Sequence, residues 1–187
     1  MEAAVARPRR RWPAVLAALL AVGLIAAMVW SGRKPESSWL VKTEATGVLT
    51  TTPERISRVE LTADGRRLIF VRGPAGWTAE HAPGPVPPPL AAALENSLKF
   101  MRASAPVRVL SREEYRGTAL AEYGLDPPRY TVSLFERGRT VLEAGFGAPN
   151  PQKVLQYMRL RGHGEVHLMS RFVGKEWERI LDAAAAR

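Results

Sequence analysis

The sequence predicts an α+β fold, with an N-terminal transmembrane helix followed by one exported domain of antiparallel β-hairpins packed with amphipathic helices. Three observations predict this class. An uncharged apolar run follows a cluster of arginines, short alternating segments are divided by glycine turns, and two later segments repeat apolar residues at helical spacing. Antiparallel sheet with helices on one side is typical of α+β domains.

The apolar run from Trp12 to Gly32 is close to the ~20 residues that a helix needs to cross ~30 Å of hydrocarbon. Four arginines precede the run and two basic residues follow it, so the positive-inside rule predicts a cytoplasmic N-terminus. A cleaved secretory signal is the alternative, but the length of the run and the lack of a clear A-x-A site favour an uncleaved anchor. The flanks expected at the two membrane surfaces are Arg9, Arg10, Arg11, Trp12 and Trp30.

The predicted organisation is a basic cytoplasmic tail (1–11), a transmembrane anchor (12–32), a polar linker (33–55) and an exported domain (56–187). We therefore expect a single-pass protein of a bacterial inner membrane, with a periplasmic or otherwise extracytoplasmic C-terminal domain. The net charge is +9, but residues 1–34 hold six basic residues and one acidic residue. The remaining excess is spread along the chain, which argues against a nucleic-acid groove.

Short alternating segments begin at Ile56 and predict a meander of three strands, with Asp64-Gly65 as a hairpin turn and Trp77 in the third strand. Leucines at helical spacing predict an amphipathic helix from Leu90 to about Arg102, whose apolar stripe covers a sheet face. Further strands are expected at 107–110, 130–134, 140–146, 154–161 and 165–169, with a loop at 145–151 and a final helix after Ser170.

Several motifs occur in a fixed order: Gly76-Trp77, a helix, the segment from Leu120 to Pro128, two alternating strands, a Gly-Pro loop and Tyr157-Met158-Arg159. This order resembles the uncharacterised bacterial domain family found beside auxiliary components of ABC-type transport systems linked to gliding motility. The resemblance covers roughly residues 56–181 and implies a membrane-anchored, non-enzymatic protein without established catalytic residues. The motif residues, for which packing is a sufficient explanation, are Trp77, Tyr123, Gly124, Leu125, Asp126, Pro127 and Tyr157.

The sequence gives no convergent set of catalytic residues, no metal site and no cofactor motif. There is no cysteine, which excludes disulfides, thiol catalysis and thiolate metal sites. His163 and His167 are four residues apart, but a turn and strand do not place them on one helical face as in zinc sites. Gly145-Phe146-Gly147 lacks the lysine and helix of a phosphate-binding loop and is interpreted as a turn.

Four arginines form the candidate binding patch. Arg159 and Arg161 share one side of a predicted strand, and we expect Arg137 and Arg139 nearby across the sheet. Such a patch suits an acidic protein partner, an anionic lipid or a glycan, whereas solubilisation of an exposed strand is the simpler explanation.

The preferred functional hypothesis is a membrane-anchored accessory or scaffold protein without enzymatic activity. It acts by protein–protein contact in a bacterial envelope assembly or ABC-type transport complex, with the membrane and subunits of that complex as partners. A binding module for an anionic glycan or lipid is the alternative, and an envelope hydrolase using His163 and His167 is the third hypothesis. The sequence leaves the partner and the oligomeric state open.

Overall fold

The computed structural model describes residues 12–32, 46–80 and 84–185. These residues belong to two units, the helix α1 (Trp12–Gly32) and a domain described from residue 46 onward. The predicted cytoplasmic tail with Arg9, Arg10 and Arg11, and the larger part of the predicted linker, lie outside the described residues.

The apolar run between Trp12 and Gly32 forms a helix, but the prediction that it is a transmembrane anchor is wrong. No helix within the described ranges is long and apolar enough to cross a membrane. The predicted inner-membrane location, single-pass topology and exported domain depended on this anchor and are corrected with it.

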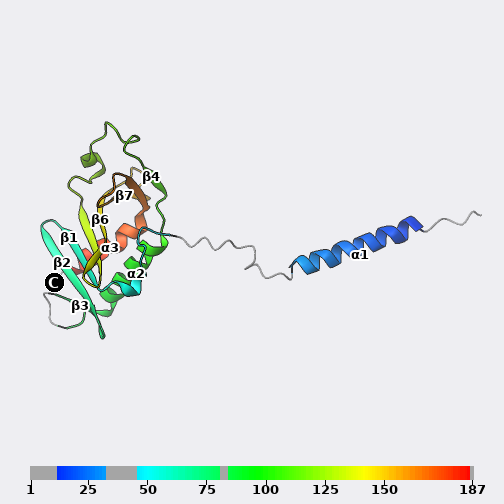
Figure 1. Ribbon diagram of the computed structural model, residues 1–187, viewed down its shortest axis with the longest axis horizontal. Helices are drawn as coiled ribbons and strands as arrows, with labels where there is room; N and C mark the ends of the chain where they lie inside the picture. The colour runs from blue at the N-terminus through cyan, green and yellow to red at the C-terminus, as the bar shows by residue number, and fades with distance from the viewer. Residues whose placement is uncertain (1–11, 33–45, 81–83, 186–187) are drawn as a thin grey trace, which may run out of the picture. The chain divides into compact units, whose positions relative to one another are not determined.

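The predicted fold class is also corrected, because the hairpins are not separate units. Within the described part of the domain they join into one eight-stranded antiparallel sheet of order β3-β2-β1-β5-β6-β7-β8-β4, which is accompanied by the helices α2 and α3 (Figure 1). The strands are β1 Arg58–Ala63, β2 Arg66–Gly73, β3 Gly76–Ala79, β4 Arg108–Leu110, β5 Tyr130–Glu136, β6 Arg139–Pro149, β7 Leu155–Leu160 and β8 Val166–Ser170. Pairing of β1 with β5 fuses the N-terminal meander with the C-terminal strands.

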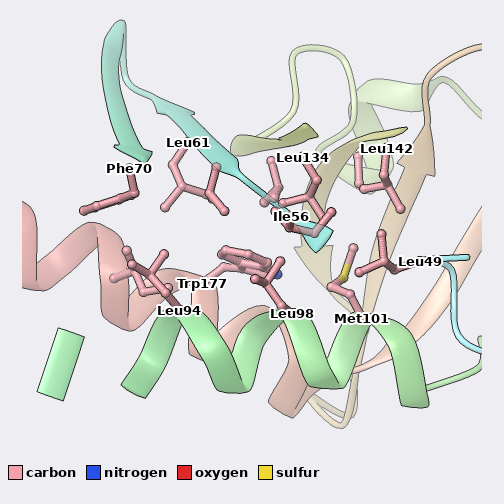
Figure 2. Close-up of a cluster of buried hydrophobic side chains, with 14 of the residues drawn as sticks. Leu49, Ile56, Leu61, Phe70, Leu94, Leu98, Met101, Leu134, Leu142 and Trp177 are labelled. Atoms are coloured by element: carbon pink, nitrogen blue, oxygen red, sulfur yellow. The ribbon is translucent and has the colours of Figure 1, made fainter. Parts of the chain in front are cut away.

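The core lies between the sheet and the helices α2 (Pro88–Ala103) and α3 (Arg171–Ala185). The predicted apolar stripe is the buried face of α2, and Leu94, Leu98 and Met101 have no exposed surface. Figure 2 shows Trp177 of α3 between α2 and the strands, in the same buried cluster. Both helices thereby cover one face of the sheet, which we call the inner face.

Part of the predicted linker belongs to the domain. The Gly47 N–H donates to the Arg102 carbonyl at 2.8 Å, and the Leu49 N–H donates to the Met101 carbonyl at 3.0 Å. Leu49 is fully buried in the core, beside the end of α2. The sequence does not indicate that this segment packs on the domain, because the residues around Leu49 are polar and its contacts are made by the backbone and by one leucine.

Candidate functional site

Two glycines lie on the sheet face opposite to the one that α2 and α3 cover. We call this opposite face the outer face. Phe146 is buried in the core, so its neighbours Gly145 and Gly147 point to the outer face. The sequence predicted a loop from Gly145, but β6 continues through both glycines to Pro149. Glycine inside a strand marks a place where another part of the backbone comes close.

The segment that comes close is the one singled out by the family resemblance. It begins with a short 3-10 helix, η3 (Leu120–Tyr123), which ends at Gly124 with a left-handed φ of 65°. A Cβ atom on Gly147 would collide with the Tyr123 carbonyl, and one on Gly124 would lie 2.8 Å from the backbone nitrogen of Ala148. These positions require glycine because the loop is pressed against β6.

Tyrosine contacts fix the same segment on the outer face. The Tyr123 ring lies 4.6 Å from the Tyr157 ring of β7 and 6.4 Å from the Tyr115 ring, measured between centroids. The Tyr115 hydroxyl in turn donates to the Gly164 carbonyl. Aromatic pairs of this kind contribute about 0.5–1.5 kcal/mol beyond the burial of their area. Two distant motif residues, Tyr123 and Tyr157, are thus brought into direct contact.

Loop and sheet together border an open cavity of about 240 Å³ on the outer face, which we call the notch. Its floor is one row of the sheet, because Gly145 pairs with Thr131 on one side and with Arg159 on the other. Strand spacing places Thr131 and Arg159 about 10 Å apart; Gly145 contributes no side chain between them, and Pro128 of the loop lies over it. The residues that define the notch are Leu125, Pro128, Thr131, Gly145, Arg159 and Arg161.

The two arginines of the notch differ in their partners. Arg161 donates from Nη1 to both carboxylate oxygens of Glu143, at 3.0 and 2.7 Å, and this hydrogen bonding raises the pKa of Arg161 above its ordinary value. Arg159 donates only from Nε, to the His163 carbonyl at 3.3 Å, and in the described part of the chain no carboxylate lies within 4.0 Å of its guanidinium. The notch therefore holds two cations against one carboxylate.

The other two predicted arginines do not join the notch. Arg137 and Arg139 flank the tight turn of the β5–β6 hairpin, where Arg137 has a φ of 49°. Glu143 lies four residues beyond Arg139 along β6, about 14 Å away at 3.4 Å per residue. The hairpin turn instead contacts the segment that precedes β1, since Glu136 accepts a hydrogen bond from the Thr51 hydroxyl at 2.8 Å and forms an ion pair with Arg55.

The histidines do not form a catalytic pair. His167 lies on β8 opposite Met158, on the inner face, and burial lowers its pKa. His163 lies in the turn between β7 and β8 and is exposed. Within residues 12–32, 46–80 and 84–185, no group of three histidine, cysteine, aspartate or glutamate residues could hold a metal ion.

The remaining motif residues serve packing or lie on the loop surface. Trp77 is buried, and its indole N–H donates to Glu95 at 2.7 Å while the Arg72 guanidinium lies 4.4 Å from its ring centroid. This cluster joins β2 and β3 to α2. Asp126 and Pro127 are exposed on the loop between Leu125 and Pro128 and do not line the notch.

A second cavity of about 260 Å³ lies where the β1–β2 hairpin meets α3. Arg66 and Arg129 line it together with three carboxylates, those of Asp64, Glu178 and Asp182. This cavity therefore holds two cations against three carboxylates, whereas the notch holds two cations against one.

Comparison with family models, with curated proteins and with solved structures finds no match for this chain. The resemblance to the transporter-associated family stays a prediction. Sequence reasoning found Arg159, Arg161 and the Tyr123–Pro128 segment separately and did not anticipate that they line one site. The signal for that convergence was Gly145-x-Gly147 inside a strand.

Proposed function

We propose that this domain is a non-enzymatic recognition module with an accessory or scaffold role, and that it acts by protein–protein contact at the notch. The observation that carries this proposal is the guanidinium of Arg159, which faces a shaped cavity without a carboxylate partner among the described residues. Arginine beside apolar surface is the composition of interface hot spots.

The size of the notch favours a protein partner over a small molecule. Pockets for small molecules and cofactors typically have about 300–1,000 Å³ and enclose most of the ligand. The notch has about 240 Å³ and lies open on the outer face. A space of this size suits one or two side chains of a larger partner that continues across the neighbouring surface.

The arrangement of the arginines also argues against an extended polyanion. A glycan chain or a lipid surface would be held by a row of cations, whereas Arg139 lies about 14 Å along β6 from Glu143, the partner of Arg161. Following the family resemblance, we infer that the partner is a subunit of a bacterial envelope assembly or an ABC-type transport complex.

Photo-crosslinking in the native cell tests this proposal. The full chain would carry a photoreactive residue either at Thr131, on the floor of the notch, or at Lys175, which is exposed on α3. We expect one discrete crosslinked protein from Thr131, lost when Arg159 and Arg161 are both replaced by alanine. Equal crosslinking from both positions, or a product that survives the double substitution, would contradict the proposal.

A further inference from the structure

We propose that the notch recognises the carboxylate of an aspartate or glutamate that stands next to an apolar side chain in an extended segment of the partner. This inference rests on the proposed function, because it names the chemistry of the protein segment bound at the same site.

The carboxylate is assigned to Arg159. Its Nε is used by the His163 carbonyl at 3.3 Å, which orients the guanidinium and leaves Nη1 and Nη2 without an acceptor in the described structure. The guanidinium fork matches the two oxygens of a carboxylate, and such charge-assisted pairs are about twice as strong as neutral hydrogen bonds. Arg161 contributes less, because its Nη1 already serves both oxygens of Glu143.

The apolar neighbour is assigned to the opposite wall. Leu125 and Pro128 form this wall. Leu125 is buried and Pro128 is half-buried, since the loop lies directly over β6: a Cβ atom on Gly145 would be 3.1 Å from Pro128 Cβ. An aliphatic side chain placed here would gain about 25 cal/mol for each Å² of apolar surface it buries.

An internal acidic residue fits better than a chain terminus. Terminal carboxylates are typically captured in nests of backbone N–H groups, whereas the anion donors of the notch are side-chain guanidiniums. Glu143 at the edge of the notch supplies an acceptor for an N–H group of the bound segment. The notch thus offers a donor, an acceptor and an apolar wall to one short stretch of chain.

Fluorescence anisotropy of the full chain with labelled nonapeptides tests the inference. The peptides carry one central glutamate beside leucine and have blocked ends; matched peptides replace the glutamate by glutamine, replace the leucine by serine, or move the carboxylate to a free C-terminus. We expect the glutamine peptide to bind about tenfold more weakly, as for a lost charge-assisted pair. The serine peptide should also lose affinity, and the free C-terminus should not replace the glutamate.

Three variants complete the experiment. Arg159→Ala should lose the preference for glutamate over glutamine, and Arg159→Lys should restore only part of it, since lysine keeps the charge without the fork. Arg137→Ala removes the same charge from the hairpin turn and should leave the preference within about twofold of the wild type. Thermal unfolding of each variant shows that the fold is retained.

Equal binding of the glutamate and glutamine peptides by the wild type would overturn the inference, as would equal losses in Arg159→Ala and Arg137→Ala. Tighter binding of the free C-terminus, or of a uronic-acid oligomer, would overturn it in favour of another source of carboxylate. If the Thr131 crosslink forms and depends on the two arginines while the peptides are not discriminated, the inference fails and the proposed function stands. If the crosslink itself is absent, the proposed function fails.

Discussion

The two arginine pairs of the sheet, Arg137 with Arg139 and Arg159 with Arg161, have the same spacing and the same charge but different surroundings. The first pair flanks an open turn, where a Cβ atom on Gly138 would meet nothing. The second pair borders a cavity, because the loop carrying Leu125 and Pro128 lies over β6 beside it. Two arginines at this spacing do not by themselves form a cavity. The cavity beside Arg159 and Arg161 exists because a second backbone segment lies close to the sheet there.

We expect the largest effect on stability from replacing a glycine of β6 against which the loop packs. Gly147→Ala should lower the free energy of unfolding by about 1–3 kcal/mol, because its Cβ atom collides with the Tyr123 carbonyl. Gly138→Ala, with open space but a φ of 78°, should cost about 1 kcal/mol. Urea unfolding of both variants measures the difference, and a Gly147→Ala protein as stable as the wild type would show that the loop does not press on β6.

Lowering the pH should destabilise the strands β7 and β8, beside Arg159, more than the β5–β6 hairpin turn. Burial lowers the pKa of His167, with Glu165 acting in the opposite sense and His163 in the same sense. Because the unfolded chain then binds the proton more readily, stability is complete above the unfolded pKa of about 6.5 and declines as the pH falls below it.

Hydrogen exchange between pH 7.5 and 5.5 would locate this loss. We expect faster exchange in β7 and β8 at the lower pH, with little change at the β5–β6 turn, and a flatter pH profile in His167→Gln. A uniform response across the sheet, or an unchanged profile in that variant, would disprove the role given to His167.

A smaller effect is expected from the ion pair that occupies Arg161. Glu143→Gln should release the Arg161 guanidinium and strengthen binding of the glutamate peptide about two- to fivefold, in line with the modest energies of exposed ion pairs. The gain should shrink as salt is raised. Glutamine at position 143 keeps one oxygen that can accept from the bound segment, and Glu136→Gln, at the hairpin turn, is the matched control and should leave binding unchanged. Weaker binding by Glu143→Gln would contradict the expectation, because losing the second carboxylate oxygen would then outweigh the release of Arg161.

The smallest effect should come from Glu136 itself. A hydrogen bond from Thr51 and pairing with Arg55 lower its pKa, so its contribution to stability is present above about pH 4.3 and is lost as the pH falls. Arg55 is exposed although Glu136 is half-buried, and salt screens the pair. Calorimetry at pH 7 should show only a slight decrease in the melting temperature of Glu136→Gln. A large decrease would show that the contacts of Glu136 at the hairpin turn contribute substantially to stability.

Local features were predictable from the sequence because their causes are local. The turn at Asp64-Gly65 and the buried stripe of α2 follow from backbone preference and helical period. The pairing of β1 with β5 and of β4 with β8 joins segments about 70 and 60 residues apart, and periodicity carries no information on such partners.

The site was predictable only in pieces. Arg159, Arg161 and the Tyr123–Pro128 segment were recognised, but Gly145 and Gly147 were interpreted as a loop because glycine favours turns as well as close approaches. The anchor prediction failed because no helix of the described residues is long and apolar enough to cross a membrane. Leu49 was missed because a single leucine among threonines gives no period.

The most direct test of the central claim is a map of backbone amide shifts of the full chain titrated with the glutamate nonapeptide, with the glutamine peptide as reference. The account predicts that the residues with the largest shifts are Thr131, Gly145, Arg159 and Gly162, while the amides of Arg137 to Arg139 stay in place. Shifts centred on the hairpin turn, or equal shifts with both peptides, would contradict the assignment of recognition to the notch.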